Sequence, residues 1–196
     1  MKIITLLFIV TVISFSCHSH YSKGTFVKLE TQYGDVTIEL YPKNAPLTVQ
    51  NFLTYVDSGF YKQSTFYRVL KSENQPTNSF RSDLIQGGIY QSNYKKSVIL
   101  KGIPHESTRD TKLSHLDGSI SLARTLPGTA SSEFFICIGN QPAYDYGGNS
   151  NPEKQGYAVF GRVVKGMEII RQIHNLPENG EDYITPVLIL NIERVN

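Results

Sequence analysis

The chain has 196 residues, of which 40% are hydrophobic and 18% charged, and its formal net charge is +2. This length and composition suit one compact domain with a sizeable core and leave too little chain for two full domains. Because no cluster of Lys and Arg interleaved with aromatic residues could follow a phosphate backbone, we expect no nucleic-acid partner.

The first residues have the pattern of an export signal. Lys2 precedes an almost purely apolar stretch over residues 3–15, which ends before Ser16 and Cys17. A basic start, a short apolar core and a small residue before the cut are typical of a signal peptide, which we predict over residues 1–16. The apolar stretch is shorter than the roughly 20 residues that span a bilayer, so a permanent transmembrane helix is the weaker interpretation.

The segment Ser14-Phe15-Ser16-Cys17 resembles the lipobox of bacterial lipoproteins, although Phe15 replaces the usual small residue. The resemblance implies that Cys17 is acylated and anchors the protein to a membrane of the bacterial cell envelope. Residues 17–24 are then a lipid-anchored tether, and residues 25–196 form the exported domain. The alternative is an ordinary secretory signal with a chance cysteine.

The domain is predicted to begin with a β-hairpin and a helix. Residues 26–31 and 36–40 alternate in polarity on either side of a Gly-containing turn, as in an antiparallel hairpin with one buried face. Asn44 is a plausible cap for a helix that Gly59 ends. The apolar residues 49, 52, 53 and 56 fall on one stripe of that helix.

Further strands are predicted over residues 65–70, 119–123, 133–138, 157–164 and 187–195, with a second helix at 167–174. Many short strands with two helices favour a mainly β fold, a closed antiparallel barrel, over alternating βα units. Two stretches, 71–83 and 146–155, are rich in turn formers and have the composition of insertions. They are either tolerated surface loops or a rim that selects partners.

No signature of covalent or metal chemistry is present. The sequence contains no HExxH, no paired CxxC and no GxSxG, so zincin, zinc-ribbon and hydrolase interpretations lack their motifs. We therefore expect no metal and no cofactor. Two of the five histidines, His18 and His20, flank Ser19 in the tether, and the other three are scattered singly; we expect all of them at the surface or at caps.

Three segments stand out: Phe66-Tyr67-Arg68-Val69, Leu84-Ile85-Gln86-Gly87-Gly88 and Ser132-Glu133-Phe134-Phe135-Ile136. In this order they resemble the signature of the cyclophilin-type peptidyl-prolyl cis/trans isomerases, and the resemblance runs from about residue 26 to 195. The bacterial exported branch of the family looks closest. The resemblance implies an eight-stranded antiparallel barrel capped by two α-helices, with an active-site groove on its outside.

The family's site residues carry over position by position. Arg68 takes the place of the catalytic arginine and Gln86 that of the groove glutamine, with Phe66 beside them in the proline pocket. Ala123 and Arg124 would offer backbone groups to the substrate. The remaining substrate-binding positions implied by the resemblance are Leu84, Glu133, Phe135, Tyr144 and Tyr157, the last standing where many members carry His. Taken singly, the apolar residues could equally be barrel core, and Arg68 a solvated strand residue.

The implied function is isomerisation of X-Pro bonds in unfolded or extended exported polypeptides by a monomer. Rotation breaks amide resonance, a barrier of about 18–20 kcal/mol, and returns the lone pair to the proline nitrogen. A cation aimed at that nitrogen binds the twisted state better than the planar one. Arg68 would supply this cation, and Gln86 would orient it.

Two positions depart from the family pattern. Glu133 stands where glutamine is expected, and Asp83 where an aromatic residue is expected. A carboxylate near Arg68 would offset part of its field and favour basic residues beside proline, unless Glu133 points to solvent. Two rival functions stay open: a catalytically weak cyclophilin-like module that binds Pro-containing segments, and an unrelated all-β lipoprotein that binds carbohydrate or another small ligand.

Overall fold

The computed structural model describes residues 24–76 and 80–195, so the predicted signal peptide, Cys17 and all but the last residue of the tether lie outside it. The strands are β1 (Thr25–Thr31), β2 (Gly34–Leu40), β3 (Ser64–Leu70), β4 (Leu84–Gly88), β5 (Ser119–Leu122), β6 (Phe134–Cys137), β7 (Ala158–Lys165), β8 (Glu178–Asn179) and β9 (Asp182–Val195). The helices are α1 (Pro46–Asp57), α2 (Tyr94–Ser97), α3 (Thr108–Thr111), α4 (Met167–His174) and the 3₁₀ helix η1 (Pro142–Tyr144).

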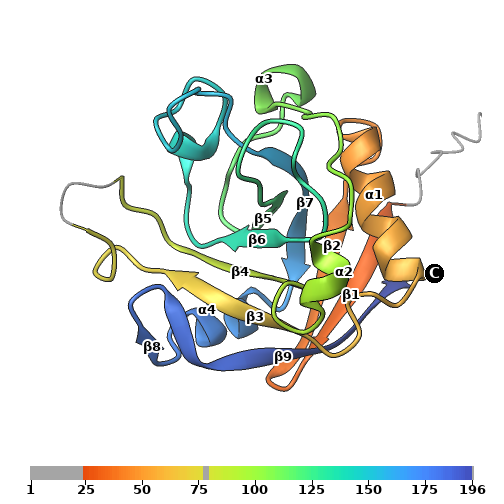
Figure 1. The fold of residues 1–196 in the computed structure, drawn as a ribbon, viewed down its shortest axis with the longest axis vertical. Helices are drawn as coiled ribbons and strands as arrows, with labels where there is room; N and C mark the ends of the chain where they lie inside the picture. Colours follow the sequence, from red (N-terminus) through yellow and green to blue (C-terminus); the bar gives the residue numbers. More distant parts are fainter. Residues whose placement is uncertain (1–23, 77–79, 196) are drawn as a thin grey trace, which may run out of the picture.

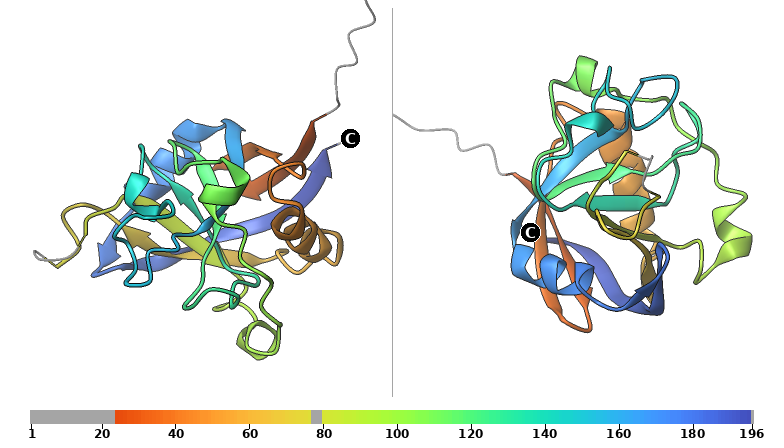
Figure 2. Two further views of the ribbon diagram at one scale, coloured as in Figure 1. Left: turned by 90° about the horizontal axis from the view of Figure 1, so that it is seen from above. Right: turned by 90° about the vertical axis from the view of Figure 1, so that its left-hand side faces the viewer.

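The strands form a closed antiparallel barrel (Figure 1). Eight of them follow the order β1-β2-β7-β5-β6-β4-β3-β9, and β1 pairs with β9 to close the circle. The short β8 pairs only with β9 and stands outside the circle. Closure brings the start of β1 beside the end of β9, which Figure 2 shows from two sides. The predicted eight-stranded barrel is confirmed.

The two longer helices occur where the sequence predicts them. Helix α1 packs against β7 and β9, and α4 packs against β2 and β4. The predicted cap of α1 is wrong: the N-cap is Ala45, and Asn44 Nδ2 instead donates to Thr111 O at 2.9 Å. Glu106, from a distant loop, accepts the first-turn N–H groups of residues 47 and 48 at 3.1 and 2.7 Å. Sequence-local capping rules cannot find such a partner.

Several short elements were not predicted. Helices α2 and α3 each have four residues, too few to show an apolar stripe. Strand β4 carries two glycines, which weaken the alternation typical of a strand. Strand β9 begins at Asp182, five residues before the predicted start, in a segment joined to β8 by a turn at Gly180.

Alternation along the strands divides the apolar residues into two clusters. On β6, Phe134 and Ile136 point into the barrel, whereas Phe135 and Cys137 point outward. The barrel core holds the largest fully buried side chains, including Phe52, Tyr61, Phe66, Phe134 and Phe160. The outer cluster consists of Leu70, Leu84, Phe135, Cys137 and Tyr144, with Phe80, Ala123 and Tyr157 packed on it. This outer cluster is the floor of the candidate site.

Among the described residues, no helix is long and apolar enough to cross a membrane.

Candidate active site

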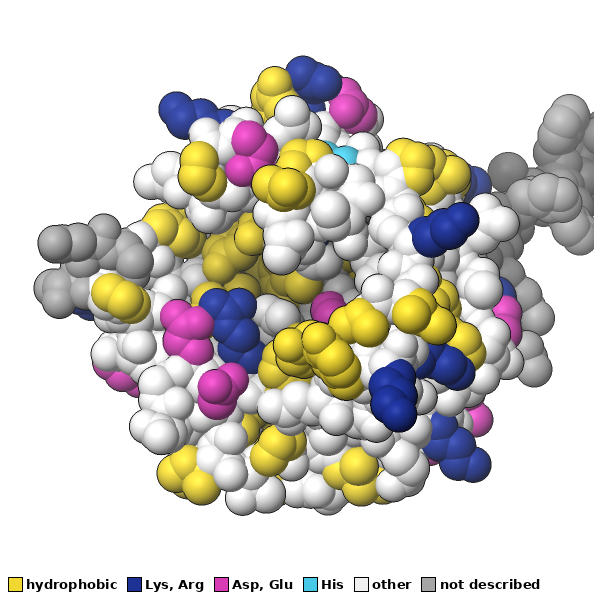
Figure 3. Space-filling model, viewed as in Figure 1, with side chains coloured by type: hydrophobic (Ala, Val, Ile, Leu, Met, Phe, Trp, Pro, Cys, Tyr) yellow, Lys and Arg dark blue, Asp and Glu magenta, His cyan; other side chains and the backbone are white. Residues whose placement is uncertain are grey.

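A groove of about 700 Å³ lies on the outside of the barrel, over the outer cluster. Figure 3 shows it as a hollow with a hydrophobic floor and basic and acidic side chains at one edge. Its lining includes nine of the ten substrate and catalytic residues expected from the sequence: Arg68, Leu84, Gln86, Ala123, Arg124, Glu133, Phe135, Tyr144 and Tyr157.

Phe66 is the exception, because the structure places it in the barrel core. Its side chain is fully buried and packs edge-to-face on Phe134, with ring centroids 5.7 Å apart. The reason is a β-bulge in β3: Phe66 and Arg68 pair with adjacent residues of β4, so Tyr67 is an extra residue. In a regular strand Phe66 and Arg68 would share a face. The bulge lets Phe66 point inward and Arg68 outward.

The Arg68 guanidinium is held from two sides. Its Nη1 donates to Gln86 Oε1 at 2.9 Å, and Gln86 is its cross-strand partner on β4. Its Nε and Nη2 both donate to Glu181 Oε2, at 3.0 and 2.5 Å. Glu181 was not expected from the sequence. It lies 113 residues away along the chain, in the turn between β8 and β9, and no local pattern pairs such distant residues.

A hydrogen-bonded chain continues from Arg68 across the groove. Gln86 Nε2 donates to Tyr67 Oη at 3.0 Å, and Tyr67 donates to Glu133 Oε2 at 2.9 Å. Each member therefore fixes the orientation of the next, with a carboxylate at both ends. The extra residue of the bulge, Tyr67, is what joins the two halves of this chain.

Glu133 does not contact Arg68 directly. Its Oε1 accepts the backbone N–H groups of Ile89 and Tyr90, at 2.9 and 3.0 Å, and the hydroxyl of Ser132 at 3.0 Å. Burial raises the pKa of the Glu133 carboxyl, although these hydrogen bonds oppose the rise. The carboxylate is half-buried at the groove, does not bond to Arg68, and organises the turn after β4.

The floor of the groove is an aromatic cluster. The Phe135 ring packs edge-on against Tyr157, with ring centroids 5.3 Å apart. It is tilted against Tyr144, with centroids 5.5 Å apart, and Leu84 packs in the same cluster. Burial raises the pKa of the Tyr144 phenol to about 12, so it is neutral at physiological pH. An uncharged, largely apolar floor of this kind suits a small ring such as a pyrrolidine.

His115 lies behind this floor, which corrects the expectation that the histidines are surface or capping residues. Its ring is 1% exposed and stacks on Phe135 with centroids 5.9 Å apart. Nδ1 is 2.7 Å from Asp145 Oδ1, and Nε2 is 2.9 Å from Ser121 Oγ. Burial lowers the pKa of His115, and Asp145 only partly opposes this. The Ser121 hydroxyl is fully buried beneath the floor, so these contacts support the aromatic cluster and offer no accessible nucleophile.

Arg124 uses its side chain as well as its backbone. The guanidinium is almost fully buried, donates through Nε to Gly156 O at 3.1 Å, and pairs with Glu153 at 2.8 Å. It thereby ties the 146–155 segment to the groove. The backbone N–H of Ala123 donates to Glu133 O at 2.8 Å, so this group is not available to a substrate as the sequence analysis expected.

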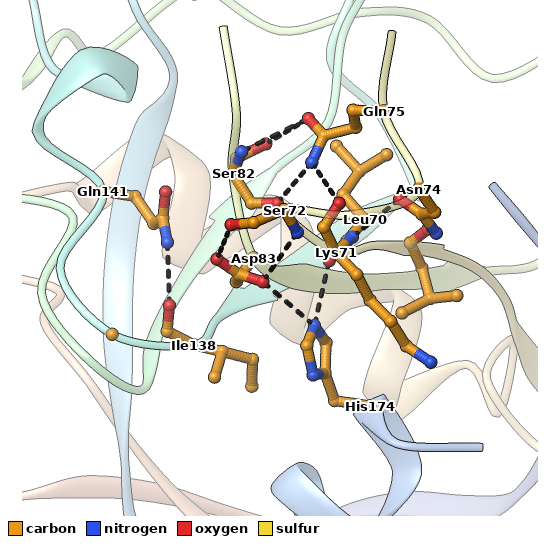
Figure 4. Close-up of polar contacts among 12 residues, drawn as sticks. Leu70, Lys71, Ser72, Asn74, Gln75, Ser82, Asp83, Ile138, Gln141 and His174 are labelled. Atoms are coloured by element: carbon orange, nitrogen blue, oxygen red, sulfur yellow. Dashed lines mark hydrogen bonds and ion pairs between the residues drawn. The ribbon is translucent and has the colours of Figure 1, made fainter. Parts of the chain in front are cut away.

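The described residues of the 71–83 insertion form part of the rim. Phe80 packs edge-on against Tyr144 at 5.9 Å, and Ser82 Oγ lies 2.8 Å from Tyr144 Oη. Phe80 thus brings an aromatic ring to the groove from within the insertion. Asp83 turns away, accepts from Ser72 at 3.1 and 2.8 Å, and lies near His174 (Figure 4). A lone aromatic residue among turn formers was the only sequence signal for Phe80.

Within residues 24–76 and 80–195, no group of three or more His, Cys, Asp or Glu side chains could hold a metal ion.

The chain is similar to known isomerases over most of its length. Residues 26–194 match the family described as cyclophilin type peptidyl-prolyl cis-trans isomerase/CLD. The chain is 36% identical over 169 residues to peptidyl-prolyl cis-trans isomerase A of Dickeya dadantii, covering 84% of this chain and 80% of that protein. It is 33% identical over 148 residues to isomerase B of Escherichia coli, covering 75% and 82%.

Solved structures show the same fold. A cyclophilin-type peptidyl-prolyl cis-trans isomerase of Cryptosporidium parvum superposes with a TM-score of 0.71 at 24% identity, covering 88% of this chain and 98% of that one. Its structure in the presence of the dipeptide Ala-Pro gives a TM-score of 0.70. The family match and the relatives, together with this barrel and its groove, show that the chain belongs to the cyclophilin-type peptidyl-prolyl cis-trans isomerases.

Proposed function

We propose that this isomerase rotates X-Pro bonds without a covalent step, with Arg68 as the cation that stabilises the twisted amide. The observation that carries the proposal is the position of the guanidinium. It lies at the edge of a groove whose floor is Leu84, Phe135 and Tyr144, within the same cavity. The floor would hold the pyrrolidine ring while the chain on the other side of the amide rotates.

The barrier to X-Pro rotation and the electronic change at the proline nitrogen support this role for Arg68. Uncatalysed X-Pro exchange takes tens to hundreds of seconds, and lowering its barrier by about 7 kcal/mol would accelerate it about 100,000-fold. The twisted proline nitrogen carries a localised lone pair, which accepts a hydrogen bond that the planar amide cannot accept. A preoriented N–H donor beside it therefore stabilises the transition state selectively.

Replacing Arg68 by Ala tests the proposal. We expect kcat/KM on a short X-Pro peptide to fall by about 100-fold or more, since a preorganised donor of this kind contributes factors of that order. The melting temperature should hardly change, because the side chain is about one-third exposed. Gln86→Ala should reduce activity less, because Gln86 orients the guanidinium and does not supply the charge. An Arg68→Ala enzyme as fast as the wild type would refute the mechanism and favour the rival in which the groove only binds Pro-containing segments.

Pro-containing, unfolded or extended polypeptides are the substrates that we propose. The groove is open to the surface and is formed by strands and loops that an extended chain could cross. The similar Cryptosporidium protein was crystallised with Ala-Pro, which supports a proline-centred ligand for this groove as well. Chemical-shift titration with Ala-Pro should perturb residues of the outer cluster first.

We also propose that the domain works in the bacterial cell envelope, on exported proteins, with Cys17 as its lipid anchor. The support is the sequence: Lys2, the apolar run over residues 3–15 and the lipobox-like Ser14-Phe15-Ser16-Cys17. Cys17→Ala should release the protein from membranes in fractionation, and mass spectrometry of the wild type should find an acylated N-terminus. A mutant that still sediments with membranes, from a wild type without acyl mass, would indicate a signal anchor instead.

A further inference from the structure

Glu181 is the one acidic side chain in direct contact with the Arg68 guanidinium in the described part of the chain. A single oxygen, Oε2, accepts from both Nε and Nη2, while Nη1 is bound to Gln86. An arginine has five N–H donors in one plane, and these contacts use three of them. One N–H on Nη1 and one on Nη2 remain for a substrate.

Hydrogen bonds to the backbone hold the turn that carries Glu181. The Glu181 carbonyl accepts from Val69 N at 2.7 Å, directly beside Arg68 on β3. Asn74 Nδ2 donates to Gly180 O at 2.9 Å, which ties the same turn to the 71–83 insertion. Gly180 has φ +63, a left-handed conformation that glycine adopts without strain. The carboxylate is thus presented to Arg68 by a turn that is bonded to the strand carrying Arg68.

We propose that Glu181 is a positioning residue that fixes the direction of the Arg68 fork, so that its free Nη edge faces the X-Pro amide. The inference rests on the proposed role of Arg68. The ion pair is about one-third exposed on both sides, and pairs of that kind contribute little to stability. Glu181 accepts two of the three hydrogen bonds that the Arg68 guanidinium donates. A contribution to stability is therefore a poor explanation for this contact.

Two effects of Glu181 oppose each other, and they can be separated. Its negative charge weakens the field of Arg68 at the amide, whereas its hydrogen bonds restrict a long side chain with several rotatable bonds. Solvent screens the charge effect at this exposure. A hydrogen bond to the amide nitrogen depends steeply on distance and angle, and a displacement of 1 Å can cost up to about 100-fold in rate. Orientation should therefore dominate.

Two substitutions at this position distinguish orientation from charge. Glu181→Gln keeps a carbonyl oxygen that can accept from both Nε and Nη2, but removes the charge. Glu181→Ala removes both. We expect kcat on a neutral X-Pro peptide to fall about tenfold in Glu181→Ala and to stay within about threefold of wild type in Glu181→Gln, with KM little changed in either.

The matched control is Asp182→Asn, which removes one negative charge from the next residue of the same hairpin. Asp182 is exposed, and its side chain has no hydrogen bond or ion pair among the described contacts. This variant should have wild-type kcat. A second readout is the NMR signal of the Arg68 Nε–H group, which should stay sharp in wild type and Glu181→Gln and broaden in Glu181→Ala.

The outcomes separate this inference from the proposal on which it rests. If Arg68→Ala is inactive, a Glu181→Ala variant with unchanged or higher kcat overturns the positioning role. Equal losses in the Ala and Gln variants would overturn it as well, because they would indicate charge. If Arg68→Ala is fully active, the Arg68 mechanism itself fails, whatever Glu181 does. In the double variant with Arg68→Ala, Glu181→Ala should have no further effect.

Discussion

Glu133 and Arg68 lie near opposite ends of one hydrogen-bonded chain, yet their substitutions should have different consequences. Glu133 accepts two backbone N–H groups, from Ile89 and Tyr90, and two hydroxyls, from Tyr67 and Ser132. Glu133→Ala would leave these four donors, three of them in part-buried bonds, without their acceptor, so we expect the free energy of unfolding to fall by roughly 2–3 kcal/mol. Urea titration measures this. A loss below about 0.5 kcal/mol would contradict the structural role.

Glu133→Gln is the gentler change, because an amide oxygen can still accept at the position of Oε1. Stability should drop by about 1 kcal/mol or less, the usual worth of one altered hydrogen bond. The preference for basic residues beside proline, which the sequence analysis predicts from this carboxylate, stays a prediction. Comparing kcat/KM of wild type and Glu133→Gln on neutral and Lys-flanked peptides measures it, and an unchanged ratio would mean that the charge does not reach the substrate.

His115 should make the stability of the domain sensitive to acid. Burial lowers its pKa in the folded state below the ordinary value of 6.5, so the unfolded chain takes up the proton more readily. Stability is then complete above about pH 6.5 and falls as the pH drops below that value. The groups that face the ring are the Asp145 carboxylate, the Ser121 hydroxyl, and the rings of Phe135 and Tyr144.

Melting temperatures between pH 7.5 and 5 measure the effect, with His115→Gln compared against wild type. The decline with acid should be shallower in His115→Gln. His105 is the control, because burial lowers its pKa too but it lies by the exposed carbonyl of Gln155. A His105→Gln variant that removes more of the acid sensitivity than His115→Gln would show that the titrating group is elsewhere.

Some site residues could be placed from the sequence, and others could not. The family resemblance was sufficient to place Arg68 and Gln86 together in the groove, although β4 was not predicted as a strand, and the structure shows the two residues as cross-strand neighbours. Phe66 was misplaced because a bulge of one residue reverses which face a side chain takes. Glu181 was missed because its contact with Arg68 depends on the closure of β9 against β3, which no local pattern encodes.

At the scale of elements, the rim insertion and the β8–β9 hairpin are joined by a nearly buried ion pair. Lys71 Nζ lies 2.5 Å from Glu178 Oε2 and donates to Leu176 O at 3.1 Å, and both charged side chains are less than one-fifth exposed. Lys71→Met would leave the Glu178 carboxylate unpaired, so we expect the free energy of unfolding to fall by roughly 3 kcal/mol. Guanidinium titration gives the value.

The double variant Lys71→Met/Glu178→Met is the control for this pair. Replacing both charges by apolar groups should recover most of the lost stability, because the desolvation cost disappears with the pair. Activity is a second readout, since the same hairpin presents Glu181 to Arg68. If the double variant is less stable than Lys71→Met alone, the pair contributes more than its desolvation costs.

Most strands and the two long helices could be predicted because their apolar residues repeat with a period, whereas β4, β8 and the connections could not. In the described parts of this insertion, residues 71–76 and 80–83, side chains bond to the backbone, such as Gln75 Nε2 to Lys71 O and Ser82 O, both at 2.7 Å (Figure 4). Such contacts depend on the fold already being present. The sequence left open whether this insertion was a plain surface loop or a selective rim; four of its residues, Gln75, Pro76, Phe80 and Ser82, line the groove, and selection of partners stays a prediction.

At the scale of the whole molecule, the buried apolar residues form two separate clusters, and we expect stability to depend mainly on one and activity on the other. The barrel core lies inside the closed sheet, and the outer cluster lies on the other face of the same strands. Strand β6 contributes to both with consecutive phenylalanines: Phe134 is fully buried among Phe52, Tyr61 and Phe66, and Phe135 faces Tyr144 and Tyr157.

These neighbouring phenylalanines allow the two clusters to be tested separately. Phe134→Ala should lower the free energy of unfolding by about 3–5 kcal/mol, because it opens a cavity in a closed core. Phe135→Ala should cost about 1–2 kcal/mol, since its cavity opens into the groove and water can enter it. The order reverses for activity: per folded molecule, kcat/KM on an X-Pro peptide should fall at least tenfold in Phe135→Ala, which loses the floor under the pyrrolidine ring, and less than threefold in Phe134→Ala. Assays at low temperature, where both variants are folded by circular dichroism, keep the two effects apart. Equal activity losses in the two variants would mean that the barrel core and the groove floor act as one unit.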